Sequence, residues 1–231
     1  MTLLFDVLPF AALVVATLSI LLVLYVENER RPSIEFLEHH DEVTAEEEKN
    51  GRMWYHVKVR NKKPKFSFLN RDAALSCVAR VEFLDKSTLK PLPVGQIESK
   101  WSRRPEPRNY SDSKFDIGRV PACQRLDAGF GAEMFDVIMK CRGRRDAFAT
   151  DPWIVYDLDL HPDPRSEPNR TNPFHEKWEK LRIDVDECLL RIEIEAINLG
   201  KPQKAYYRLR NTGTEFENLT IEKAEDRNQL S

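Results

Sequence analysis

The chain has 231 residues, and its 36 Lys and Arg nearly balance its 38 Asp and Glu, giving a formal net charge of -2. This balance argues against a nucleic-acid-binding protein, which would normally present a distinctly basic face. The sequence has no phosphate-binding glycine loop, no G-x-S-x-G and no H-E-x-x-H motif. Composition and motifs therefore give no enzyme signature.

One stretch near the N-terminus is long and apolar enough to cross a bilayer. Val7–Val26 contains no charge, and its only polar side chains are Thr17 and Ser19. As a helix rising about 1.5 Å per residue, it would extend about 30 Å, the thickness of the hydrocarbon core. No Lys or Arg precedes it and no small-residue cleavage site follows it, which disfavours a signal peptide. The sequence therefore predicts that Val7–Val26 inserts in the lipid bilayer.

Positive charges predict the orientation of this anchor. Arg30 and Arg31 follow the apolar segment closely, whereas no Lys or Arg precedes it. Lys and Arg are enriched on the cytoplasmic side of membrane helices. We therefore expect a single-pass protein of the cell membrane with its large domain in the cytoplasm.

The rest of the chain alternates between apolar and polar residues, which is the period of half-buried strands. We expect residues 1–31 to form the anchor and its polar flank, residues 32–222 a β domain, and residues 223–231 a polar tail. Short strands with one apolar face predict two antiparallel sheets packed face to face. The expected strands are Ile34–Glu38, Tyr55–Val59, Leu75–Phe83, Phe135–Cys141, Ile154–Leu160, Cys188–Ala196, Ala205–Leu209 and Leu219–Glu222.

The same alternation predicts which side chains face the core. In Leu75–Phe83 we expect the inward face to begin with Leu75. In Phe135–Cys141 we expect Phe135, Val137 and Met139 to share one inward face.

The four cysteines do not indicate a metal site, because no C-x-x-C pair or zinc-like spacing occurs. Cys77, Cys141 and Cys188 fall on the apolar faces of expected strands, where a free thiol behaves as a small hydrophobe. Buried thiols suit a reducing compartment. An external domain would instead form disulfides, with Cys77 to Cys188 as the candidate bridge between the two sheets.

One irregular segment has the composition of a recognition surface. It contains an aromatic residue beside two arginines and two prolines, a combination found at protein interfaces. The candidate partner-binding residues are Trp101, Arg103, Arg104, Pro105 and Pro107. The alternative is that Trp101 plugs the end of the sandwich while the arginines face water.

Two sets of residues could in principle suit a metal. The densest is His39–Glu42, but neighbouring side chains on a strand point to opposite faces, so we interpret it as a solvated strand end. His161, Asp163 and His175 could join Asp157 and Asp159 around a cation, but the intervening prolines leave their geometry arbitrary. We therefore expect no metal ligands, no cofactor and no catalytic residues, and keep a membrane-tethered metal-dependent hydrolase as an alternative.

Four short segments of the β domain resemble a group of uncharacterised prokaryotic, especially archaeal, proteins. The segments are Tyr55–Asn61 (YHVKVRN), Ser76–Phe83 (SCVARVEF), Trp101–Pro107 (WSRRPEP) and Tyr207–Asn211 (YRLRN). The resemblance implies one membrane helix followed by an immunoglobulin-like β-sandwich, and it carries over no catalytic residue. The fold class we expect is therefore all-β, an immunoglobulin-like antiparallel sandwich preceded by a transmembrane helix.

These observations favour a binding function. We expect a single-pass, membrane-anchored β-sandwich that acts as a non-enzymatic protein-interaction module, with a protein partner that the sequence does not identify. An extracellular receptor or adhesin is the alternative within the same class.

Overall fold

The structure of the protein is a computed structural model that describes residues 3–37, 51–65, 69–99, 101, 124–129, 131–150 and 179–224, with the side chains of the helix from residue 10 onward. One helix, α1 (Leu3–Arg30), is followed by strands. These are β1 (Ile34–Leu37), β2 (Arg52–Asn61), β3 (Ala74–Asp85), β4 (Pro91–Ser99), β5 (Gln124–Leu126), β6 (Glu133–Cys141), β7 (Ala147–Ala149), β8 (Arg182–Ile183), β9 (Glu187–Glu195), β10 (Gln203–Asn211) and β11 (Leu219–Ala224), the last preceded by the 3-10 turn η3 (Phe216–Asn218).

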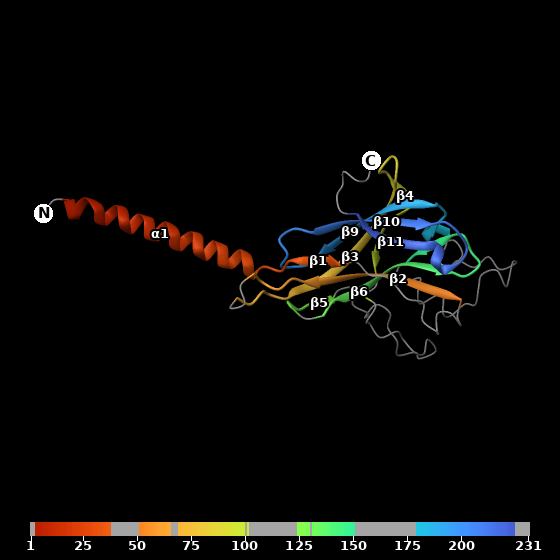
Figure 1. Cartoon of the computed structure of the whole chain (residues 1–231), viewed down its shortest axis with the longest axis horizontal. Coiled ribbons are helices and arrows are strands. Elements are labelled where there is room, and N and C mark those ends of the chain that lie inside the picture. Colours follow the sequence, from red (N-terminus) through yellow and green to blue (C-terminus); the bar gives the residue numbers. More distant parts are fainter. Residues whose placement is uncertain are drawn as a thin grey trace.

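The helix α1 projects away from the β domain, with the N-terminus at its far tip (Figure 1). Phe10–Arg30 is long and apolar enough to cross a membrane, and its most apolar window buries nothing inside the protein. The hydroxyls of Thr17 and Ser19 donate hydrogen bonds to backbone carbonyls four residues earlier, both at 2.8 Å. Both hydroxyls are thus satisfied within the helix, as an apolar surrounding requires. The predicted apolar helix is confirmed, a property that membrane anchors and signal sequences share.

Two antiparallel sheets follow the helix, which confirms a mostly β domain. One sheet has five strands in the order β1-β2-β6-β7-β8; the other has six, with the path β11-β10-β9-β3-β4 and β5 paired to β3. In immunoglobulin domains the third strand from the end lies in the sheet opposite the last two. Here β9, β10 and β11 are consecutive neighbours in one sheet. The described strand order therefore does not confirm the expected immunoglobulin-like topology.

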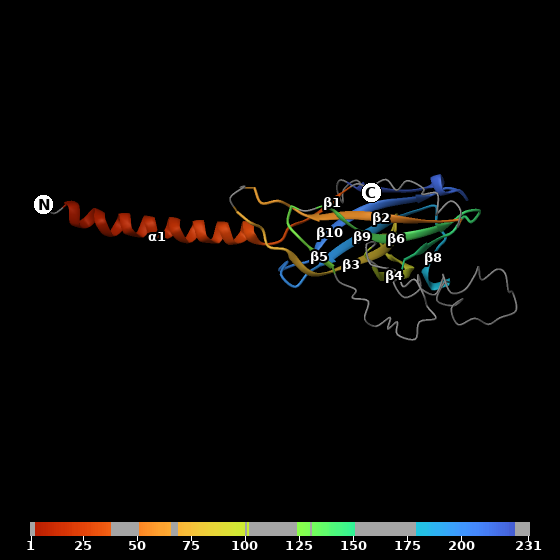
Figure 2. The same cartoon turned by 90° about the horizontal axis from the view of Figure 1, so that it is seen from below.

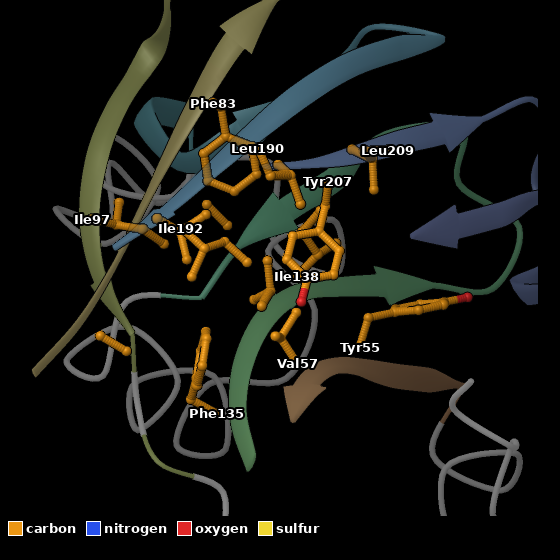
Figure 3. Packing of buried hydrophobic residues seen from close by; sticks show 14 of the residues in the cluster. Tyr55, Val57, Phe83, Ile97, Phe135, Ile138, Leu190, Ile192, Tyr207 and Leu209 are labelled. Carbon is orange, nitrogen blue, oxygen red and sulfur yellow. The ribbon is translucent and has the colours of Figure 1, made fainter. Parts of the chain in front are cut away.

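The two sheets bury their apolar faces against each other (Figure 3). Each large apolar side chain that is fully buried in this way stabilises the fold by about 1.5–3 kcal/mol. The side chains that meet in Figure 3 are Phe83, Leu190, Ile192, Tyr207 and Leu209 from the six-stranded sheet and Tyr55, Val57, Phe135 and Ile138 from the five-stranded sheet.

The expected inward face of β3 is wrong at its first residue. Leu75 is 40% exposed, and Ala74 is buried instead. Ser76 adopts a left-handed φ of 53°, and the pairing of β3 with β5 shifts between Ala74 and Cys77. From Cys77 onward the predicted face is buried as expected. The irregular backbone at Ser76 therefore explains why simple alternation fails for Leu75.

The expected inward residues of β6, Phe135, Val137 and Met139, are all buried in the core. Tyr55 pairs with Ile138 and the next residue of β2 pairs with Asp136, so Val137 is an extra residue in β6, which is a β-bulge. Ile138, which simple alternation places on the other face, is also buried in the core that contains Phe135 (Figure 3). Every residue from Phe135 to Lys140 is buried. The expected strand Ile154–Leu160 lies outside the described residues.

Candidate functional site

Trp101 is the one candidate binding residue that lies among the described residues. Its side chain is 1% exposed and packs edge-on against Phe135, with ring centroids 5.4 Å apart. Its Nε1 donates a hydrogen bond to the carbonyl of Cys77 at 3.2 Å, so the polar edge of the indole is satisfied inside the domain. A buried indole is not available to a partner. The expectation that Trp101 forms part of a contact surface is therefore corrected, because its side chain fills the core.

The other four candidates, Arg103, Arg104, Pro105 and Pro107, lie outside the described residues. The backbone of Trp101, which precedes them in the sequence, forms an antiparallel bridge with Phe135.

The last turn of α1 is held to the β domain by a buried carboxylate. Glu29 is 6% exposed, and its Oε2 lies 3.2 Å from Nη2 of Arg71. The same carboxylate oxygen accepts a hydrogen bond from the backbone N–H of Lys65 at 3.3 Å. The N–H of Asp72 donates to the carbonyl of Arg30 at 2.7 Å, which satisfies one of the carbonyls that a helix end leaves free. The β2–β3 connection thus binds the last turn of α1 through an ion pair and hydrogen bonds.

Asn61 completes this junction, which we call the helix end of the domain. Its side chain is 1% exposed, and its Oδ1 accepts a hydrogen bond from the N–H of Ser33 at 3.0 Å. Its Nδ2 donates to the carbonyls of Asp72 at 2.8 Å and Leu126 at 3.2 Å. One amide thereby connects the residues after α1, the β2–β3 connection and β5.

The opposite end of the sandwich, which we call the far end, contains a buried lysine. Lys140 on β6 is fully buried and donates hydrogen bonds to Oδ1 of Asn211 and, at 2.8 Å, to the carbonyl of Gly213. The Nδ2 of Asn211 donates in turn to the carbonyl of Arg145. Burial lowers the pKa of Lys140, because desolvation disfavours the charged ammonium. The network joins the two sheets where β6 and β10 end.

A buried carboxylate lies close by at the far end. Asp146 is 5% exposed; its Oδ1 accepts a hydrogen bond from Nε of Arg144 at 2.7 Å, and its Oδ2 lies 3.0 Å from Nε of Arg182. Burial alone would raise the pKa of Asp146, but the hydrogen bond from Arg144 and the charges of both arginines outweigh it and lower that pKa. These ion pairs connect the β6–β7 turn to β8 and are structural.

The described part of the chain contains no candidate metal site. Among the described residues, no three His, Cys, Asp or Glu side chains are grouped closely enough to hold an ion. His56 Nε2 lies 3.1 Å from Oδ1 of Asp136, a pair across β2 and β6. The histidines of the hydrolase alternative, His161 and His175, lie outside the described residues.

Cys77 and Cys188, the candidate pair for a bridge in an external domain, form no disulfide. Both thiols are buried, as expected for the apolar faces of strands, and both lie in the six-stranded sheet rather than in opposite sheets. Cys188 is opposite Asp85 at one end of β3, whereas Cys77 is near the other end of β3. Burial raises the pKa of Cys188 to about 12, so this thiol stays protonated at neutral pH.

Sequence reasoning missed both buried asparagines, although the strand pattern held a signal for them. Asn61 continues the inward positions of Val57 and Val59, and Asn211 continues those of Tyr207 and Leu209. A polar residue at the inward position that ends an apolar alternation must find hydrogen bonds inside the protein. Glu29 gave no such signal, because its burial depends on a β2–β3 connection distant in sequence.

The resemblance to prokaryotic membrane proteins agrees with the structure at a coarse level. Both have an N-terminal apolar helix followed by two antiparallel sheets. No family model, curated protein or solved structure matches this chain, so its family is not identified.

Proposed function

We propose that this protein is a single-pass membrane protein whose β domain acts in the cytoplasm as a non-enzymatic protein-interaction module. The observation that carries the proposal is the exposed apolar helix α1, whose last turn is built into the domain through Glu29. Glu29 and Arg30 hold the end of α1 against the β2–β3 connection. The absence of a small-residue cleavage site after Val26 favours a permanent anchor over a signal peptide.

The proposed contact surface is the segment that follows Trp101 and carries Arg103, Arg104, Pro105 and Pro107. The buried indole fixes the start of this segment, and arginine is enriched at the energetic centres of protein interfaces. The buried polar clusters around Asn61 and Lys140 hold strands and turns together.

The test compares two pairs of substitutions in the full-length membrane protein. A photo-crosslinking residue in place of Ser102 reports partner contact in cells, and the yield of crosslinked protein is quantified. Arg103→Ala with Arg104→Ala should abolish that crosslink and leave the melting temperature unchanged. Lys86→Ala with Lys90→Ala removes two cations from the exposed β3–β4 turn and is the matched control, which should leave the crosslink intact.

Two outcomes would reject this surface. Undiminished crosslinking from position 102 in the variant that carries Arg103→Ala and Arg104→Ala would show that these arginines do not bind the partner. If Arg103→Ala with Arg104→Ala lowers the melting temperature as much as Trp101→Ala does, the segment is a structural part of the domain.

A further inference from the structure

We infer that the helix end of the β domain is itself a membrane-binding surface for anionic lipid headgroups. This inference rests on the proposed anchoring by α1. It concerns how the domain is seated on the bilayer and which lipids it prefers.

The length of α1 places the helix end at the headgroup layer. If Val7–Val26 fills the hydrocarbon core, the helix continues for only Glu27–Arg30, which extend about 6 Å at 1.5 Å per residue. The headgroup layer on each side of the core is roughly 5–8 Å thick. The domain therefore begins where that layer ends, and the contacts of Glu29 and Asn61 leave no flexible tether between the two.

Connections of the β domain lie beside the point where α1 enters it. The β2–β3 connection lies next to the last turn of α1, and the β9–β10 turn is near it at the same end (Figures 1 and 2). Hydrogen bonds link the two connections, because Nδ2 of Asn198 donates to the carbonyl of Ala73 at 2.8 Å. The N–H of Ile197 also donates to the carbonyl of Leu75 at 3.0 Å. The described parts of the two connections are therefore joined at the helix end.

This surface carries exposed lysines. Lys62, Lys63 and Lys65 of the β2–β3 connection are exposed, and so is Lys201 of the β9–β10 turn. A cation near an anionic lipid surface strengthens membrane binding by about fivefold.

Most acidic groups at the same end are already engaged by arginine. Glu29 pairs with Arg71, Glu27 lies 3.4 Å from Arg30, and Asp127 lies 2.7 Å from Arg125. Glu27, Asp72 and Asp127 are exposed, and the backbone of Asp72 binds Arg30. Arginines offset the paired carboxylates, so the lysines leave these groups with a net positive charge.

Apolar side chains complete the surface. Outside α1, the described residues include three exposed large apolar side chains, and two of them, Ile197 at 81% and Leu75 at 40%, are neighbours at the helix end. The third, Leu89, is in the β3–β4 turn, remote from the helix. Apolar side chains bordered by lysines are the combination that binds the boundary between headgroups and acyl chains.

The experiment uses the full chain in lipid nanodiscs made of phosphatidylcholine alone or with phosphatidylserine. Amide hydrogen exchange is followed in residues 62–65 and 196–202 at the helix end and in residues 86–90 as an internal control. Phosphatidylserine should slow exchange at the helix end by about tenfold and leave the β3–β4 turn unchanged. Equal exchange in the two lipids would overturn the inference.

Two matched variants sharpen the test. Ile197→Ser with Lys201→Gln should remove most of the slowing at residues 62–65. Leu89→Ser with Lys90→Gln makes the same chemical change in the β3–β4 turn and should preserve it. Equal effects of the two variants would contradict a specific surface at the helix end.

Extraction of cell membranes with alkaline carbonate separates the two proposals. A chain that stays in the membrane but shows no lipid-dependent protection would overturn only the surface inference. A chain released into the supernatant would overturn the anchor, and with it the surface.

Discussion

The two ends of the β sandwich are closed by the same residue type, but with different partners. Asn61 ends β2 at the helix end, and Asn211 ends β10 at the far end; each follows an arginine that follows an apolar residue. Both side chains are 1% exposed. Asn61 binds three backbone groups, whereas Asn211 accepts a hydrogen bond from the buried ammonium of Lys140.

The two ends differ in what the asparagine holds, which is a buried ammonium at the far end and backbone groups at the helix end. The far end also exposes lysines and Leu89 in the β3–β4 turn. At the far end, Lys140 is held by Asn211, and Asp146 is held by two arginines. At the helix end the amide of Asn61 holds the backbone, while lysines and Ile197 remain exposed. In our account the bilayer supplies the contacts of these exposed groups.

The largest expected effect tests whether both ends share one core. Trp101→Ala removes a fully buried indole and should destabilise the domain by about 3–5 kcal/mol. Both ends should then lose hydrogen-exchange protection together. Trp101→Phe, which keeps a ring but loses the hydrogen bond to Cys77, should cost about 1 kcal/mol by denaturant unfolding. Loss of protection at one end alone would show that the ends unfold independently.

Asn211→Ala should be the next most damaging change, because it leaves a buried cation with one acceptor fewer. We expect a loss of about 3 kcal/mol in unfolding free energy. Adding Lys140→Met to this variant removes the charge and should recover part of the loss. If the double variant loses as much unfolding free energy as the two single variants together, the two side chains are not coupled.

Asn61→Ala should cost less, about 2 kcal/mol, because it leaves only neutral backbone groups without partners. Its effect should be largest at the helix end, where exchange of the β2–β3 connection should accelerate more than exchange of the β6–β7 turn. A uniform acceleration would mean that Asn61 supports the whole sandwich rather than the junction.

The smallest effect concerns alkaline pH. The folded-state pKa of Lys140 lies below its ordinary value of 10.5, so between these values the unfolded chain binds more protons than the folded one. Stability should therefore rise with pH across that window, by about 1.4 kcal/mol per pH unit, relative to Lys140→Met. Parallel curves for the two proteins in denaturant titrations would show that Lys140 does not titrate abnormally.

Local alternation predicted the strands well where neighbouring strands pair regularly. In β2, Tyr55, Val57 and Val59 are buried as expected. The extra residue of the bulge belongs to β6, so the alternation of β2 itself is not interrupted. The prediction failed at Leu75, where a left-handed Ser76 shifts the inward face, and it missed the burial of Ile138 beside the β-bulge of β6. Such irregularities depend on the partner strand, which a single sequence does not reveal.

The candidate site was predicted less well, for a related reason. Composition drew attention to Trp101, but it did not show whether the side chain lies at an interface or in the core, where the structure places it. That distinction depends on Phe135 and Cys77, which contact the indole only after the sheets assemble. The surface around Ile197 was missed because its components come from distant turns.

The membrane topology tests the central claim most directly. A tag placed after Ser231 is probed with protease in intact cells and in lysed cells, with the amount of full-length protein as the readout. Our account predicts that the tag is protected until lysis, because the domain and its basic helix end face the anionic cytoplasmic leaflet. Cleavage of the tag in intact cells would contradict the account by placing the domain outside the cell.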